Sequence, residues 1–221
     1  MQPVSFPPVS FPIIHELDGW DLLWIRLEAL SGKDEEIAAL LKAAGDRARA
    51  AFSLETLSSD PTVAAMRSLF RAAGCDPTRY RPSSEALLRR VLKGEDLPAI
   101  HPVVDLNNCL SVALAVPCCA AVEGSFASPV VLRAGRAGES YESLRGPFNL
   151  EGKPLLADGE GPFGTPITDS QRVKMKAGDR RAWMVAYLPR GVVSPEAALE
   201  TLDRLLAEAP IVRMEEAGVS R

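Results

Sequence analysis

The sequence predicts a single α+β domain, and the prediction depends on how its apolar residues are spaced. Amphipathic helical patterns occupy most of the first half of the chain, and one more comes near its end. Between them, residues 116–188 consist of short apolar runs separated by Gly- and Pro-rich turns, which is typical of strands. Helices first, strands later and a helix last fit an α+β fold better than alternating βαβ units. No change in composition within residues 13–210 marks a second domain.

A proline-rich arm opens the chain, and we assign it to residues 1–12. The pentapeptide PVSFP occurs at residues 3–7 and again at residues 8–12. Proline at this density is incompatible with a helix or a central strand, so we expect an extended arm. Two interpretations stay open: the arm is disordered at its tip, or it docks on a protein partner.

Five segments have the apolar spacing of amphipathic helices. They are residues 33–52, 61–73, 83–93, 105–115 and 195–209. Asp60 caps the second segment and Pro61 follows at the first helical position, while Gly94 ends the third.

Strands are expected where apolar and aromatic residues form short runs. The clearest is WDLLWIRLEAL at residues 20–30, and the others are residues 129–134, 172–177 and 182–188. The last helix is followed by Pro210, and residues 211–221 are expected to form a C-terminal tail.

Composition and charge exclude several classes of function. The 221 residues are 47% hydrophobic and 24% charged, which are globular values. A net charge of −4 argues against a general nucleic-acid coat, although it allows a local basic patch. No apolar run reaches the roughly 18 residues of a membrane helix, and the N-terminus lacks a signal-peptide pattern, so we expect a cytoplasmic protein.

The cysteines and histidines do not have the spacing of a metal site. Cys118 and Cys119 are adjacent, Cys75 and Cys109 are isolated, and the chain has 2 histidines. We therefore expect neither a metal nor a cofactor, and we expect the cysteines to be small buried residues.

Polar residues are concentrated between residues 81 and 108. The helical stretch RPSSEALLRRVLKG places Glu85 and Arg89 opposite its apolar face. After the turn at His101-Pro102, Asp105 and Asn108 are three residues apart and project from the same side of a helix. One interpretation is a capping Asp105 and a solvated Asn108. The other is a polar pocket in which the carboxylate orients an amide that binds a ligand.

At these residues the chain resembles the B3/B4 domain family, which occurs within the β subunit of bacterial phenylalanyl-tRNA synthetase and as stand-alone proteins. The resemblance starts with RPSSEALLRRVLKG, LP and VDLNN, and it covers roughly residues 54–206 in consistent order. Later matching segments are Leu132-Arg133-Ala134 with Gly138-Glu139, then Leu156-Ala157-Asp158, then Thr168-Asp169-Ser170-Gln171-Arg172. The family implies a β-rich, sandwich-like core with helices packed around it. Stand-alone members often have Asn-Pro where this chain has His101-Pro102.

The resemblance implies a function on tRNA. In the synthetase, this domain hydrolyses tyrosine wrongly attached to phenylalanine tRNA. A stand-alone copy is then expected to be a trans-editing deacylase whose partner is the tRNA acceptor end, with a free amino acid as a further ligand. DNA and membranes are not expected partners. An aminoacyl ester is already activated, so the site must chiefly position water and stabilise an oxyanion.

Candidate site residues follow from the resembling segments. The candidate catalytic residues are Asn108, Asp105, Glu139 and Asp158; the candidate substrate- or tRNA-binding residues are Arg81, Ser83, Glu85, Arg89, His101, Asp169 and Arg172. Asn108 is expected to bind the amino acid or the ester carbonyl, with Asp105 orienting it or binding an α-ammonium group.

The other candidates have less specific roles. Carboxylates at positions 139, 158 and 169 are expected to orient water or anchor an ammonium group, and the arginines to bind phosphate or carboxylate. His101 is a candidate proton carrier. Structural interpretations compete with each role: Ser83 as a helix cap, His101 as a turn residue, and Asp158 and Asp169 in turns.

Three functions remain open. An editing hydrolase predicts a pocket for one amino-acid side chain with a basic rim. A non-catalytic RNA- or protein-binding module predicts a filled pocket or no clustered cations. An amino-acid enzyme or sensor predicts a deep acidic pocket with no path for RNA. RNA contact is favoured if six cations share one face around Asn108: Arg89, Arg90, Lys93, Arg133, Arg136 and Arg172.

Overall fold

The computed structural model describes residues 11–221, so most of the proline-rich arm, including the first PVSFP copy, lies outside the described residues. In chain order the elements are β1 (Ile13–His15), β2 (Trp20–Ala29), α1 (Asp34–Ala51), η1 (Leu57–Ser59), α2 (Pro61–Ala72), α3 (Ser83–Leu92), α4 (Pro102–Leu114), β3 (Cys118–Val122), β4 (Val130–Ala134), β5 (Ser140–Ser143), β6 (Gly146–Asn149), β7 (Pro154–Asp158), β8 (Gly161–Gly164), η2 (Gln171–Val173), β9 (Arg181–Pro189), α5 (Pro195–Glu208) and β10 (Val212–Ser220). The α+β prediction is confirmed.

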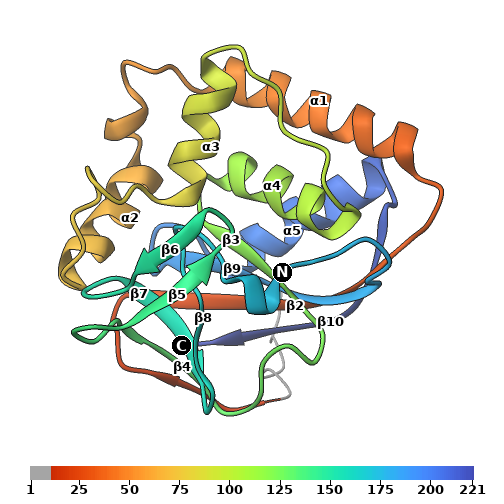
Figure 1. The fold of residues 1–221 in the computed structure, drawn as a ribbon. Coiled ribbons are helices and arrows are strands. Elements are labelled where there is room, and N and C mark those ends of the chain that lie inside the picture. The colour runs from red at the N-terminus through yellow and green to blue at the C-terminus, as the bar shows by residue number, and fades with distance from the viewer. Residues whose placement is uncertain (1–10) are drawn as a thin grey trace.

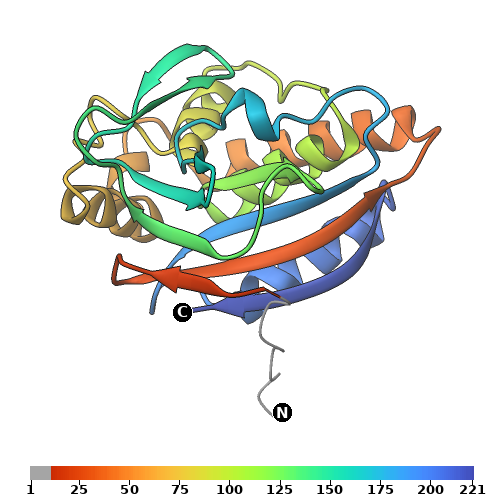
Figure 2. The same ribbon diagram turned by 60° about the horizontal axis from the view of Figure 1, so that its bottom comes forward.

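The strands form two sheets that pack face to face. The main sheet has the order β10-β2-β9-β3, the second sheet the order β1-β4-β7-β8, and β5 and β6 form a separate hairpin. Helices α1, α4 and α5 lie on the side of the main sheet away from the second sheet (Figure 1). Figure 2 shows the long strands β2 and β10 side by side beneath the helices.

Strand β2 has apolar side chains on both of its faces because both faces of the main sheet are covered. Leu23, Ile25 and Leu27 belong to the core beneath the helices. Trp20, Leu22 and Trp24 belong to the core between the two sheets, which α2 closes with Met66 and Phe70. A central strand covered on both faces has a near-continuous apolar run, as its sequence does.

All five predicted α-helices are present, four of them within one residue of the predicted bounds. Helix α4 starts earlier, at Pro102, because His101 caps it: the Val103 amide donates to His101 Nδ1 at 3.3 Å. Asp105 is therefore inside the first turn. All four cysteines are free and buried, as expected.

Two local expectations need correction. Residues 172–177 were expected to form a strand, but they form η2 and a loop in which Val173 and Met175 are buried and Lys174 is exposed. The alternation of apolar and polar residues is real, but no strand pairs with it.

The second correction concerns the expected C-terminal tail. Residues 212–220 form β10, which pairs with β2 along its length. A bulge between Met214 and Glu216 shifts the alternation, so that Val212 and Met214 before it and Ala217 and Val219 after it all pack on the helical core. Because the bulge interrupts the two-residue alternation of apolar and polar side chains, the sequence pattern does not predict this strand.

The end of the arm belongs to the core between the sheets. Phe11, from the second PVSFP copy, packs edge-on against Trp24 at 5.2 Å and Trp183 at 5.1 Å between ring centroids. No helix within residues 11–221 is long and apolar enough to cross a membrane.

Candidate functional site

A cavity of about 740 Å³ lies between α3, α4, the start of β3 and the β5–β6 hairpin, and we call it the α3–α4 cavity. In Figure 1 the hairpin lies below α3, next to the end of α2. The polar and charged residues that line it are Arg79, Tyr80, Arg81, Ser83, Arg90, Asn107, Asn108, Arg145, Thr168, Asp169 and Lys174. Apolar side chains complete the wall, among them Leu87, Val104, Phe148 and Met175. Its volume is that of a typical small-molecule site.

One face of α4 forms the inner wall of the cavity. Val104, Asn107 and Asn108 line it at the helical spacing i, i+3, i+4. Asn107 is 6% exposed and Asn108 8%, so both amides are nearly removed from solvent. Asn107 Nδ2 donates to the Cys118 carbonyl at 3.3 Å, and its Oδ1 has no hydrogen-bond partner among residues 11–221. The side chain of Asn108 makes no hydrogen bond to any of residues 11–221.

The buried, unpaired amide oxygen of Asn107 points to a ligand. A buried polar group without a partner costs about 1–3 kcal/mol, and such groups are rare in folded proteins. Asn107 was not among the residues predicted from sequence. The signal for it was present, because it shares the cavity face of the helix with Val104 and Asn108.

Asp169 is the one carboxylate among the residues lining the α3–α4 cavity. Its Oδ1 is buried, and none of the described residues donates a hydrogen bond to it. Burial raises the pKa of Asp169 to about 7, although hydrogen bonding to the Cys119 thiol and the Ala120 backbone opposes the rise. The carboxyl group therefore titrates near neutral pH.

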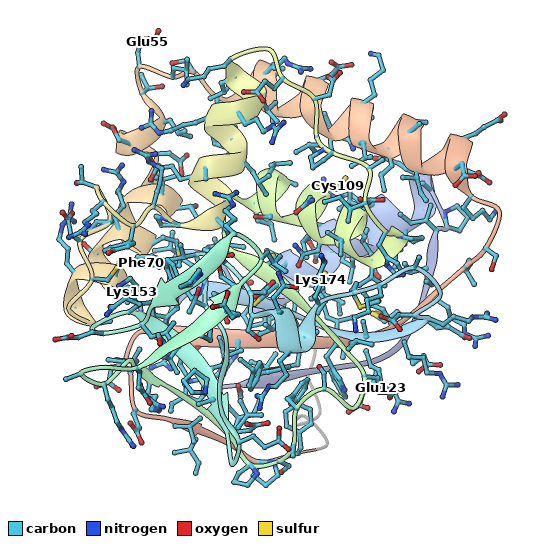
Figure 3. All side chains as sticks on the ribbon, in the orientation of Figure 1. Glu55, Phe70, Cys109, Glu123, Lys153 and Lys174 are labelled. Carbon is cyan, nitrogen blue, oxygen red and sulfur yellow. The ribbon has the colours of Figure 1, made fainter. Side chains whose placement is uncertain are left out.

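Cations gather at the rim of this cavity. The lining residues include Arg79, Arg81, Arg90, Arg145 and Lys174. Arg90 pairs with Glu95 at 2.9 Å. Arg145 and Lys174 are exposed, and neither has an acidic partner within residues 11–221. Figure 3 shows Lys174 below α4, near the centre of the molecule.

Glu85 holds α3 to α2. It is fully buried and accepts two hydrogen bonds from Arg67 and one from Arg89, all at 2.8 Å. Burial alone would raise the pKa of Glu85, but the hydrogen bonds from the two arginines outweigh it and hold the pKa below its ordinary value. Arg81 Nε lies 3.4 Å from the same carboxylate and also lines the cavity. Glu85 and Arg89 thus do not line the cavity, but they hold α3, which forms part of its wall, in place.

The Glu139 and Asp158 carboxylates lie outside the α3–α4 cavity. Glu139 makes two hydrogen bonds of 2.7 Å with Arg133, which is the main reason that its pKa is lowered to about 2. Asp158 accepts from the Ala127 amide at 2.9 Å and from Arg172 at 3.0 Å. These contacts fix turns of the second sheet.

Asp105 and His101 line a different cavity of about 510 Å³ at the start of α4, which we call the loop cavity. Asp105 Oδ1 accepts from the Ile100 amide at 2.8 Å, and burial raises the pKa of this carboxyl group. His101 Nε2 donates to the Asp179 carbonyl at 2.9 Å. Ile100 lines both cavities, so the loop that carries it separates them.

The structure thus brings four of the predicted site residues into one cavity: Asn108, Arg81, Ser83 and Asp169. The other predicted residues lie in the loop cavity or in ion pairs elsewhere. Of the six cations considered for RNA contact, Arg90 alone lines the α3–α4 cavity. The gathered cations at positions 79, 145 and 174 come from three separate loops, and no sequence pattern connects them.

Within residues 11–221, no three His, Cys, Asp or Glu side chains are grouped so as to hold a metal ion. The polar groups of the α3–α4 cavity are instead amides, one carboxylate, hydroxyls and cations. Such a set can bind an anionic ligand at the rim and donate to or accept from polar atoms inside.

Comparison with known proteins assigns the family. The model of the B3/4 domain family matches residues 65–201, so the chain belongs to this family. The matched range contains α3, α4 and both Asp169 and Lys174. Among solved structures, an N-terminal fragment of the phenylalanyl-tRNA synthetase β subunit from Pyrococcus horikoshii is similar, with 12% identity and a TM-score of 0.47. The alignment covers 97% of this chain and 52% of that chain, so the protein spans about half the length of the fragment. No curated protein matches the chain.

Proposed function

We propose that the protein is a tRNA-associated domain that hydrolyses mischarged aminoacyl-tRNA in the α3–α4 cavity. One observation carries the proposal: a single cavity is lined both by exposed cations and by two asparagines of α4, one of which has a buried amide oxygen without a partner within residues 11–221. Membership of the B3/4 domain family agrees with it.

The rim supports binding of a nucleic-acid end. Phosphate groups are bound by Arg and Lys side chains, and the unpaired Arg145 and Lys174 are available for this contact. The aromatic rings of Tyr80 and Phe148, which meet edge-to-face at 6.0 Å, also line the cavity. Single-stranded RNA is commonly bound by such a combination of cations and aromatic rings.

The inner wall supports binding of the aminoacyl group. Leu87, Val104 and Met175 offer apolar surface for a side chain. Asn108 has a side-chain N–H that can donate to the ester carbonyl oxygen as negative charge develops there, because it makes no hydrogen bond to any of residues 11–221.

The chemical step requires only water. The water oxygen bonds to the ester carbonyl carbon, and the bond between that carbon and the ribose oxygen breaks. The ribose oxygen takes one proton, and the released amino acid gives the other to the solvent. The role of the protein in this step is orientation of the ester and stabilisation of the oxyanion.

The deciding experiment is multiple-turnover deacylation of a panel of mischarged aminoacyl-tRNAs, with Asn108→Ala beside the wild type. We expect hydrolysis of at least one species and a loss of about 100-fold in Asn108→Ala, the effect of removing one oxyanion donor. Asp203→Asn, on the exposed side of α5, is the control variant.

Other outcomes favour other functions. Tight binding of acceptor-end RNA with no hydrolysis across the panel would overturn the editing proposal in favour of a binding module. Binding of a free amino acid with no affinity for RNA would favour a sensor.

A further inference from the structure

We infer that Asp169 recognises the free α-ammonium group of the ester, so that the cavity accepts aminoacyl esters and rejects those with an acylated amino group. The inference rests on the proposed function and adds to it a determinant of substrate specificity.

Among the carboxylates of the predicted site, Asp169 is the one with a buried oxygen that lacks any partner within residues 11–221, whereas Asp105 accepts a hydrogen bond from the Ile100 amide. Glu85, Glu139 and Asp158 each make an ion pair with an arginine. No ion pair to Asp169 occurs within residues 11–221, and its Oδ1 has no hydrogen-bond donor. The titratable groups that face it are Cys119, Tyr187 and Tyr141, none of which is a cation. Inward-facing carboxylates are normally paired, so the missing partner is expected to be a ligand.

The charges of the cavity have a definite polarity. Exposed cations such as Arg145 and Lys174 line the cavity, whereas the one lining carboxylate, Asp169, has its Oδ1 buried. An aminoacylated nucleotide has the opposite polarity, with negative phosphates at one end and a single positive ammonium group at the other. Acylation of the amine removes that positive charge and adds a carbonyl oxygen, an acceptor that would face the acceptor atoms of Asp169.

Asn107 strengthens this requirement for a donor. Its Nδ2 is committed to the Cys118 carbonyl, which leaves its unpaired Oδ1 as a second acceptor on a residue lining the same cavity. An ammonium group has three N–H donors, whereas an acylated amine retains one. A ligand with a free amine can therefore donate to both unpaired acceptors, Asp169 Oδ1 and Asn107 Oδ1, whereas an acylated amine has one N–H to donate.

Asp169 is also held in place. Tyr141 Oη donates to the Thr168 carbonyl at 2.6 Å, and the Leu144 amide donates to the Asp169 carbonyl at 3.1 Å. On the other side, the backbone of Asp169 pairs with that of Gly164 in an isolated antiparallel bridge. A rigid carboxylate has little freedom to move away from a bulkier N-acyl group, and rigidity of this kind favours specificity.

The test compares two analogues of the aminoacylated end of tRNA. Each is adenosine 5′-monophosphate with an aminoacyl group attached to its ribose through an amide in place of the ester. One analogue has a free amine and the other is N-acetylated. Calorimetry measures both dissociation constants for the wild type, Asp169→Asn, Gly164→Ala and Asp203→Asn. We expect the wild type to bind the free amine about 10- to 100-fold more tightly, as for a hydrogen bond to a charged group. Asp169→Asn keeps the shape of the side chain and should bring the ratio close to one. Gly164→Ala, whose added Cβ would lie 3.4 Å from Asp169 Oδ1 at ordinary van der Waals contact, should retain the ratio, as should Asp203→Asn.

Equal affinities of the wild type for the two analogues would overturn the inference, as would an unchanged ratio in Asp169→Asn. Hydrolysis of aminoacyl-tRNA and N-acetyl-aminoacyl-tRNA at equal rates would do the same while leaving the proposed function intact. Discrimination between the analogues without hydrolysis would support the inference and refute the hydrolase. Binding of neither analogue would overturn both.

Discussion

Glu85 and Arg67 face each other across the junction of α3 and α2, where two hydrogen bonds of 2.8 Å join the buried carboxylate to the guanidinium group. Arg89, one turn further along α3, donates to the same carboxylate. This junction positions the N-terminal part of α3, from which Ser83 and Leu87 face the α3–α4 cavity. The pair at residues 85 and 89 looks like an ordinary surface pair in the sequence, and only Arg67 on a different helix makes it a buried network.

Breaking this network should destabilise the fold. Glu85→Ala leaves Arg67 and Arg89 without their partner, and loss of one member of a buried ion pair costs about 3–5 kcal/mol. Because both arginines remain partly exposed, water compensates some of the loss, and we expect a decrease of about 2–3 kcal/mol in the free energy of unfolding. Urea denaturation measures it. The control is Lys42→Ala, which removes an exposed ion pair with Asp46 and should change stability by less than about 1 kcal/mol. Equal effects of the two substitutions would contradict the structural role of Glu85.

Local sequence signals were sufficient for the helices and the longest strand. Asp60 before Pro61 caps α2 by accepting from the amides of Thr62 and Val63, as a cap motif predicts. The apolar run of β2 predicted a strand, because a strand that is covered on both faces has apolar residues at consecutive positions. Strand β10 was missed because its bulge reverses the alternation on which strand prediction depends.

The candidate site was predictable only in part, because it is assembled from distant segments. Asn108 and Asp169 come from segments that resemble the family, and the structure brings both to one cavity. Arg145 in the hairpin turn and Lys174 after η2 have no local pattern that marks them as neighbours. Glu139 looked equally suitable in the sequence, yet its pairing with Arg133 removes it from the site.

The raised pKa of Asp169 predicts that its ionisation opposes folding. In the unfolded chain the carboxyl group ionises near pH 4, whereas in the folded protein its pKa is about 7, raised by burial. The folded state therefore binds more protons between these values, and its stability falls as pH rises from 4 to 7. The neighbouring Cys119, Tyr141 and Tyr187 stay neutral in this window because burial raises their pKa values.

The Asp169→Asn variant should lack this pH dependence. We expect the free energy of unfolding of the variant, minus that of the wild type, to be larger at pH 8 than at pH 5 by on the order of 2 kcal/mol. The difference between the two proteins isolates the contribution of Asp169, since all other titrating groups are shared. Urea denaturation at the two pH values gives the comparison. If the gain is the same at both, the pKa of Asp169 is not raised.

Salt dependence tests the cationic rim directly. If Arg145 and Lys174 each contact a phosphate of single-stranded RNA, each contributes a slope of about −0.7 to the plot of log affinity against log salt concentration. Fluorescence anisotropy of a labelled acceptor-end RNA, titrated between low and moderate salt, measures that slope. Arg145→Ala and Lys174→Ala should each make it shallower by this amount, because one released counterion is lost. Lys42→Ala, on an exposed face of α1 outside the cavity, is the matched control and should leave the slope unchanged. If all three variants keep the wild-type slope, RNA does not bind at this rim, and the cavity must take a ligand without phosphates.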